Sequence, residues 1–122
     1  MKALLLVAHG SRRESSNQEI RDLTARLAAR AGERFGHVGH AFLEIAEPSI
    51  PDGIQQCIDH GAAEVVVLPY FLSAGRHVAE DIPNDVTVKQ AEYPNVRMRI
   101  APYLGAADEV VDLLIGAAAA VD

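Results

Sequence analysis

The chain has 122 residues, 49% of them hydrophobic, and a formal net charge of -6 at neutral pH. This length supports one folded core, so we expect a single domain over residues 1–122. The acidic balance and the lack of tryptophan or of a basic stripe exclude nucleic acid as a partner. The first apolar stretch is too short for a membrane span or a signal peptide, and Cys57, the one cysteine, allows no internal disulfide, so we expect a cytoplasmic location and no membrane partner.

Short apolar runs alternate along the chain with segments of helical periodicity. Strands are predicted over residues 2–8, 38–45, 64–72 and 96–101. The first helix is predicted to follow a capping box over 16–19 and to run until Gly36, and others are predicted over 51–60, 82–93 and 106–120. The alternation predicts a flavodoxin-like α/β fold, in which a four-stranded parallel sheet of order 2-1-3-4 has helices on both faces. The last helix is expected to present Val110, Leu113, Leu114 and Ala117 to the sheet.

Two histidines, His9 and His77, lie just beyond the first and third predicted strands. These strands are neighbours in the expected order, and parallel sheets bind ligands beyond the carboxyl ends of their strands. Glu44, near the end of the second strand, belongs to the same edge. A lone histidine in such a loop more often hydrogen-bonds the backbone, but two imidazoles and a carboxylate together favour a site for a divalent first-row metal.

The sequence around these positions resembles the small class II chelatases of the sirohydrochlorin cobaltochelatase/ferrochelatase (CbiX-like) family. The matching segments are Leu6–Arg12, Ala41–Glu44 and Leu68–Pro83. The resemblance implies ATP-independent insertion of a divalent metal, Co²⁺ with Ni²⁺ or Fe²⁺ as alternatives, into sirohydrochlorin or a related tetrapyrrole. The metal is then a substrate, and no organic cofactor is implied. The resemblance also implies that His9, His77 and Glu44 are the metal-binding and catalytic residues, and that a chain of half the two-lobed length pairs as a homodimer.

The tetrapyrrole carries many carboxylates, so an acidic protein needs local positive charge to bind it. Guanidinium groups of arginine match carboxylates in a bidentate fashion. Serines in the two histidine loops can hydrogen-bond substrate, or can serve only as turn and cap residues. Gly10 and Gly75 are expected to permit close backbone approach or a positive φ. The expected substrate-binding residues are Ser11, Arg12, Ser73, Gly75 and Arg76.

The remaining histidines are weaker candidates. His37 and His40 are three apart in a predicted strand, so they should point to opposite faces and cannot share an ion. His60 ends a predicted helix, where a donor suits the terminal carbonyls. Tyr70 and Phe71 can line a tetrapyrrole pocket, although aromatic residues at the end of a buried strand more often belong to the core.

Two other functions are compatible with parts of this pattern. A histidine phosphatase also has a histidine after its first strand, but it needs an arginine immediately before it, where this chain has Ala8. A non-catalytic metal- or tetrapyrrole-binding protein stays open, because the segment Leu72-Ser73-Ala74 lacks the bulkier apolar residue expected there.

Overall fold

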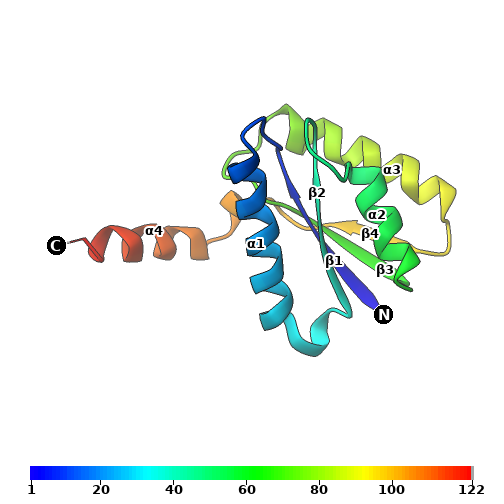
Figure 1. Ribbon diagram of the computed structural model, residues 1–122, viewed down its shortest axis with the longest axis horizontal. Coiled ribbons are helices and arrows are strands. Elements are labelled where there is room, and N and C mark those ends of the chain that lie inside the picture. The colour runs from blue at the N-terminus through cyan, green and yellow to red at the C-terminus, as the bar shows by residue number, and fades with distance from the viewer. Residues whose placement is uncertain (122) are drawn as a thin grey trace.

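The computed structural model describes residues 1–121 (Figure 1). Four parallel strands form its sheet in the order β2-β1-β3-β4. Their bounds are Lys2–Ala8 for β1, His37–Phe42 for β2, Glu64–Pro69 for β3 and Arg97–Ile100 for β4. The strand order predicted from the sequence is confirmed, and it places β1 beside β3 in the middle of the sheet. The carboxyl ends of these two strands therefore meet at one edge.

The helices follow the strands in alternation. Their bounds are Glu14–Ala31 for α1, Ile50–Asp59 for α2, Ile82–Glu92 for α3 and Glu109–Ala119 for α4; short helical turns occupy Gly32–Arg34 (η1), His77–Asp81 (η2, a π-helical turn) and Leu104–Ala106 (η3). In the part of the chain that the structure describes, no helix combines the length and the apolar character that a membrane crossing requires. The flavodoxin-like α/β class predicted from the sequence is confirmed.

The hydrophobic core lies between the sheet and the α2–α3 layer. Side chains alternate between the two faces of a strand, and Leu5 and Val7 of β1 pack in one cluster with Ile54 of α2 and Ile82 of α3. The intervening residues of β1 are buried as well, so this strand is covered on both faces. The uninterrupted apolar run at the start of the sequence is explained by this double burial.

The last helix departs from the predicted arrangement. The expectation that Val110, Leu113, Leu114 and Ala117 face the sheet is wrong, because α4 extends away from the domain (Figure 1) and has no buried residue. The cause lies in the preceding connection. The amide of Gly105 donates to Phe71 O at 2.9 Å, and a Cβ at Gly105 would lie 1.9 Å from a backbone oxygen of the segment after β3. Turn η3 is thus held against that segment, and α4 starts beyond the sheet.

The start of α1 also differs from the prediction. No capping box forms over 16–19, since α1 begins at Glu14 and Ser16 already lies in its first turn. Asn17 instead bonds back to the loop after β1: its Oδ1 accepts from the amide of Ser11 at 2.9 Å, and its Nδ2 donates to Ser11 O at 2.7 Å. This buried asparagine fixes the path of the loop that carries His9.

Candidate metal site

His9 and Glu44 are held together by backbone pairing that continues beyond the ends of β1 and β2. The amide of Leu43 donates to Ala8 O at 3.0 Å, and that of Glu44 donates to His9 O at 3.2 Å. The two loops approach so closely that a Cβ at Gly10, whose φ is 94°, would lie 2.0 Å from Glu44 O. Only glycine fits this position without strain. Gly10 was expected to permit a close backbone approach or a positive φ, and the structure confirms both.

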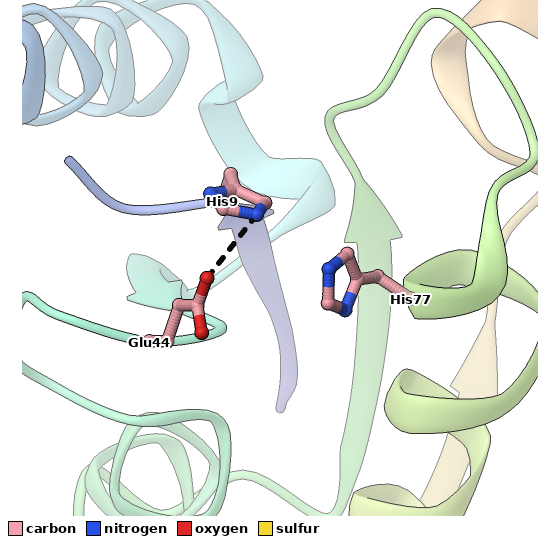
Figure 2. A group of neighbouring side chains, drawn as sticks. All are labelled: His9, Glu44 and His77. Atoms are coloured by element: carbon pink, nitrogen blue, oxygen red, sulfur yellow. Dashed lines mark ion pairs between the residues drawn. The ribbon is translucent and has the colours of Figure 1, made fainter.

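The side chains of these two residues also meet. His9 Nε2 lies 3.4 Å from Glu44 Oε1, the contact that is dashed in Figure 2. The other ring nitrogen of His9 lies 3.1 Å from Gly10 O. A carbonyl oxygen can only accept, so this contact favours the tautomer with the proton on Nδ1; the 3.4 Å between Nε2 and Glu44 Oε1 is too long for a strong hydrogen bond, so Nε2 keeps its lone pair. The lone pair that faces Glu44 is thus available to a metal ion.

His77 comes from the other side of the edge, at the first residue of η2. The turn is closed by the amide of Ile82, which donates to His77 O. One turn along, Asp81 Oδ2 lies 2.6 Å from His77 Nδ1. A carboxylate accepts and cannot donate, so this contact holds the proton on Nδ1 and leaves Nε2 of His77 free.

The three residues converge on one space (Figure 2). One potential ligand atom from each of His9, Glu44 and His77 lies within 4.8 Å of the other two, and the imidazole centroids are 5.1 Å apart at 74°. Two nitrogen ligands at about 2.1 Å from one ion are at most about 4 Å apart. The three side chains are 41–52% exposed, so small rotations suffice to close them around an ion.

Acidic and amide groups extend the site along η2 and α3. The hollow beside Glu44 and His77 is lined by Asp81, Asn84 and Asp85. Burial, and then the nearby charge of Asp81, raise the pKa of Asp85 above its usual range. The hollow offers carboxylate and amide oxygens, which are ligands that suit a divalent cation.

The loop after β1 carries two of the predicted substrate-binding residues, Ser11 and Arg12, and their surroundings differ. Ser11 Oγ accepts from the amide of Arg13 at 3.0 Å, so its hydroxyl helps to shape the turn before α1. Arg12 is exposed and lines a polar hollow together with Arg21 and the segment 45–47. A second hollow beside His9 is lined by Tyr70 and Phe71. Tyr70 is 39% exposed, so the core interpretation is wrong for this residue, whereas Phe71 does pack against the core.

The loop before η2 carries the other three predicted substrate residues. Ser73 and Gly75 are exposed, and the Gly75 carbonyl accepts from Ala79 N at 3.0 Å. Gly75 has no positive φ, and a Cβ at this residue would meet no atom within 4 Å, so the conformational reason expected for this glycine is wrong. Arg76 is 81% exposed and lies 4.0 Å from Glu80. Its guanidinium is thus free to turn toward the site.

The other histidines do not form a second metal site in the described residues, as the sequence predicts. His37 stacks on His60 with centroids 4.0 Å apart, whereas His40 meets Phe42 edge to face at 5.5 Å, so the two strand histidines do not converge. The ring of His60 bonds Gln56 O at 2.7 Å near the end of α2. Cys57 is buried, and burial raises the pKa of its thiol to about 11, which leaves it unreactive.

Asp81, Asn84 and Asp85 line the hollow beside Glu44 and His77, and the sequence pattern alone does not single them out. A signal for two of them is present, because His77, Asp81 and Asp85 recur at intervals of four residues. Such spacing places side chains on one side of a helix. The segment before residue 82 is predicted as a loop, and this interpretation hides the periodicity.

A flavodoxin-like sheet with imidazole and carboxylate groups at its switch point defines an α/β domain with a candidate metal site. The family model named CbiX matches residues 3–120. The chain therefore belongs to the CbiX family, as the sequence resemblance indicated.

Individual relatives agree with this assignment. The chain is 34% identical over 111 residues to the chloroplastic sirohydrochlorin ferrochelatase of Arabidopsis thaliana, covering 91% of this chain and 48% of that protein. It is 32% identical over 114 residues to the sirohydrochlorin cobaltochelatase of Sulfolobus acidocaldarius, covering 93% and 87%. The crystal structure of the sirohydrochlorin chelatase SirB from Bacillus subtilis subspecies spizizenii in complex with cobalt superposes with a TM-score of 0.86 at 29% identity, covering 98% of this chain and 50% of that one. The chain thus spans about half the length of several relatives that it matches.

Proposed function

We propose that this chain inserts a divalent metal ion into sirohydrochlorin or a closely related tetrapyrrole without ATP. The observation that carries the proposal is the convergence of His9, Glu44 and His77 at the switch point of a CbiX-family sheet. Relatives bear the names of ferrochelatases and cobaltochelatases, and one was crystallised with cobalt. We propose Co²⁺ as the metal substrate, with Fe²⁺ or Ni²⁺ as alternatives, and no organic cofactor.

His77, His9 and Glu44 have different roles in the proposed reaction. Insertion releases two protons from pyrrole nitrogens and replaces the water shell of the ion, and holding both reactants in place lowers the barrier. His77, whose tautomer is fixed by Asp81 at 2.6 Å, is the stronger metal ligand of the pair. His9 has a carboxylate 3.4 Å from its free nitrogen, which stabilises the imidazolium that forms when it accepts a pyrrole proton. Glu44 serves both the ion and that imidazolium.

The tetrapyrrole is proposed to bind over this edge. Arg12 and Arg76 lie in the loop after β1 and the loop before η2, close in sequence to His9 and His77, and both are exposed, so they can pair with its carboxylates. Ser11, Ser73 and Gly75 offer hydroxyl and backbone groups in the same two loops. Tyr70, exposed beside His9, supplies an apolar wall that suits a macrocycle.

Two copies are proposed to pair as a homodimer, because several relatives carry about twice the length that this domain matches. Pairing would place a second lobe opposite the exposed metal site. We further propose that the protein acts in the cytoplasm, where the thiol of Cys57 stays reduced.

The test is an anaerobic insertion assay. Protein, Co²⁺ and sirohydrochlorin are mixed, and the absorbance change of the macrocycle is followed against a protein-free control. We expect a rate well above the control for the wild type, and a loss of at least about 100-fold for His77→Ala and His9→Ala. His60→Ala is the matched control, since His60 lies at the end of α2, where its ring bonds Gln56.

The outcomes separate the candidate functions. A wild-type rate equal to the protein-free control, with Co²⁺ still bound, would identify a non-catalytic metal-binding protein. Equal rates for the wild type and both histidine variants would contradict the assigned roles of His9 and His77. Repeating the assay with Fe²⁺ and Ni²⁺ identifies the preferred metal.

A further inference from the structure

Ile45, the residue after Glu44, has an unusual backbone conformation. Its φ is 72°, and within residues 1–121 it is the one residue other than glycine with a positive φ. The amide of Ala46 donates to Glu44 O at 2.7 Å across it, which closes a three-residue γ-turn. γ-Turns with a positive central φ are rare and strained, and β-branched residues tolerate this region least. The strain therefore lies directly beside a residue of the candidate metal site.

Neither packing nor hydrogen bonding at Ile45 itself accounts for this conformation. Its side chain is 59% exposed and borders a polar hollow that Arg12 and Arg21 also line, so burial gains little there. The same amide-to-carbonyl bond can form in an inverse γ-turn, with a φ of about −75° and less strain. Backbone strain of this kind persists only where the surrounding structure imposes it. The neighbouring backbone must therefore impose the positive φ.

The backbone on both sides of Ile45 is fixed by pairing with other segments. Before it, the amide of Glu44 donates to His9 O at 3.2 Å. Beyond it, the chain returns to the end of β2, where the amide of the buried Phe42 donates to Pro48 O at 2.8 Å. The chain has to reverse its direction between these two fixed points, and the turn at Ile45 lies midway.

The turn also determines where Glu44 can point. Glu44 O accepts from Ala46 N and lies where a Cβ at Gly10 would clash with it, so this peptide group has little freedom. The side chain, in contrast, is 52% exposed, and its carboxylate meets His9 Nε2 at 3.4 Å (Figure 2). Because packing does little to orient this carboxylate, its position follows from the direction of the backbone at Glu44 and Ile45.

We infer that Ile45 is a positioning residue for the metal site, whose strained turn aims the Glu44 carboxylate at His9 and the ion. The inference rests on the metal-binding role proposed for Glu44 and adds the residue that holds this ligand in place. It also gives a reason for the strain, since unfavourable backbone conformations are retained at sites that need a fixed geometry.

The first experiment tests for the positive φ. Ile45→Gly and Ile45→Ala both remove the apolar side chain, but only glycine adopts a positive φ without a steric cost. The melting temperature, followed by circular dichroism, should therefore be about 3–6 °C higher for Ile45→Gly than for Ile45→Ala. At an ordinary negative φ the order is reversed, because glycine adds entropy to the unfolded chain. A melting temperature of Ile45→Gly no higher than that of Ile45→Ala would overturn the inference.

The second experiment measures the affinity for Co²⁺ by isothermal titration calorimetry. Proline fixes φ near about −65° and forbids the turn, so Ile45→Pro is expected to weaken binding by about 10-fold or more. Ile45→Gly is the matched control, because it removes the same side chain but permits the turn, and it should weaken binding much less. Circular dichroism checks that Ile45→Pro is folded; if it is not, Ala46→Pro, which deletes the amide donor of the turn, takes its place.

A double-mutant cycle shows whether Ile45 acts through Glu44. In a Glu44→Ala background, Ile45→Pro is expected to cause no further loss of affinity, because no carboxylate is left to position. The same further loss in both backgrounds, or equal losses for Ile45→Pro and Ile45→Gly, would contradict the positioning role alone. Unchanged affinity in Glu44→Ala would instead refute the proposed metal-binding role of Glu44, and the positioning role with it.

Discussion

His77 Nδ1 lies 2.6 Å from Asp81 Oδ2, one turn along η2. This contact orients the imidazole and fixes which nitrogen is free, as outer carboxylates do for histidine ligands in metal sites. The π-helical turn matters here because it brings His77 and Asp81 together at the start of α3, directly beside the ends of β1 and β2.

Asp81→Ala is therefore expected to weaken binding of Co²⁺ by about 10- to 100-fold without removing a proposed ligand. Isothermal titration calorimetry measures the affinity. Glu80→Ala is the control, because it deletes the same charge at the neighbouring residue, whose exposed side chain lies 4.0 Å from Arg76. Equal affinities for the two variants would show that Asp81 acts only through its charge.

Gly10→Ala is expected to destabilise the fold by more than about 3 kcal/mol, because backbone strain at a φ of 94° adds to the clash with Glu44 O. Gly61→Ala is the control with a similar φ of 96° but open space around its Cβ, and it should cost only about 1–2 kcal/mol. Denaturant unfolding followed by circular dichroism compares the two. A cost no larger for Gly10→Ala than for Gly61→Ala would contradict the close approach of the two loops.

Stability is expected to fall as the pH drops below about 6.5, the ordinary pKa of histidine. Burial lowers the pKa of His37 and of His40 in the folded state, with smaller contributions from the charges of His60 and Arg21. The unfolded chain then binds protons first, so protonation favours unfolding until the pH passes below the folded-state pKa values.

The measurement is the free energy of unfolding between about pH 7.5 and about pH 5.5, above the range where most carboxylates titrate. A double variant, His37→Gln with His40→Gln, should show a flatter dependence than the wild type. The same slope in both proteins would assign the pH effect to other groups.

Arg76→Glu is expected to raise the KM for an anionic tetrapyrrole by about 3- to 10-fold with a smaller change in kcat, because a solvent-exposed charge pair contributes about 1 kcal/mol or less. Arg26→Glu on α1 changes the net charge equally and is exposed, so it is the control. Added salt should reduce the difference between the two variants. A KM that responds equally to both would indicate a general charge effect and no contact with Arg76.

The sheet is predictable because its central strands are continuous apolar runs bounded by polar loops. That pattern predicts cover on both faces, and together with a flavodoxin-like strand order it places His9, Glu44 and His77 at one edge. The strand ends are less predictable: β2 and β3 end at Phe42 and Pro69, whereas apolar residues continue to 45 and 72. Side chains beyond the strands line the site, and apolarity alone does not distinguish them from the sheet.

The position of α4 could not be obtained from its pattern. Its apolar residues fit a face that packs on a sheet, but they also extend beyond that face over most of the helix. The contact that directs α4 outward, between Gly105 and Phe71 O, joins residues distant in sequence. The sequence does not predict the π-helical turn for a related reason, since its histidine and aspartate follow a loop that carries no helix start signal.

Each of the three converging groups is supplied by a different part of the chain: the end of β1, the loop after β2, and η2. An unfolded polypeptide cannot hold these groups around one ion, so the ion binds the native state in preference. Titrating Co²⁺ should consequently raise the melting temperature in proportion to the logarithm of its free concentration. The ion thereby becomes a reporter of whether the central strands and η2 are assembled together.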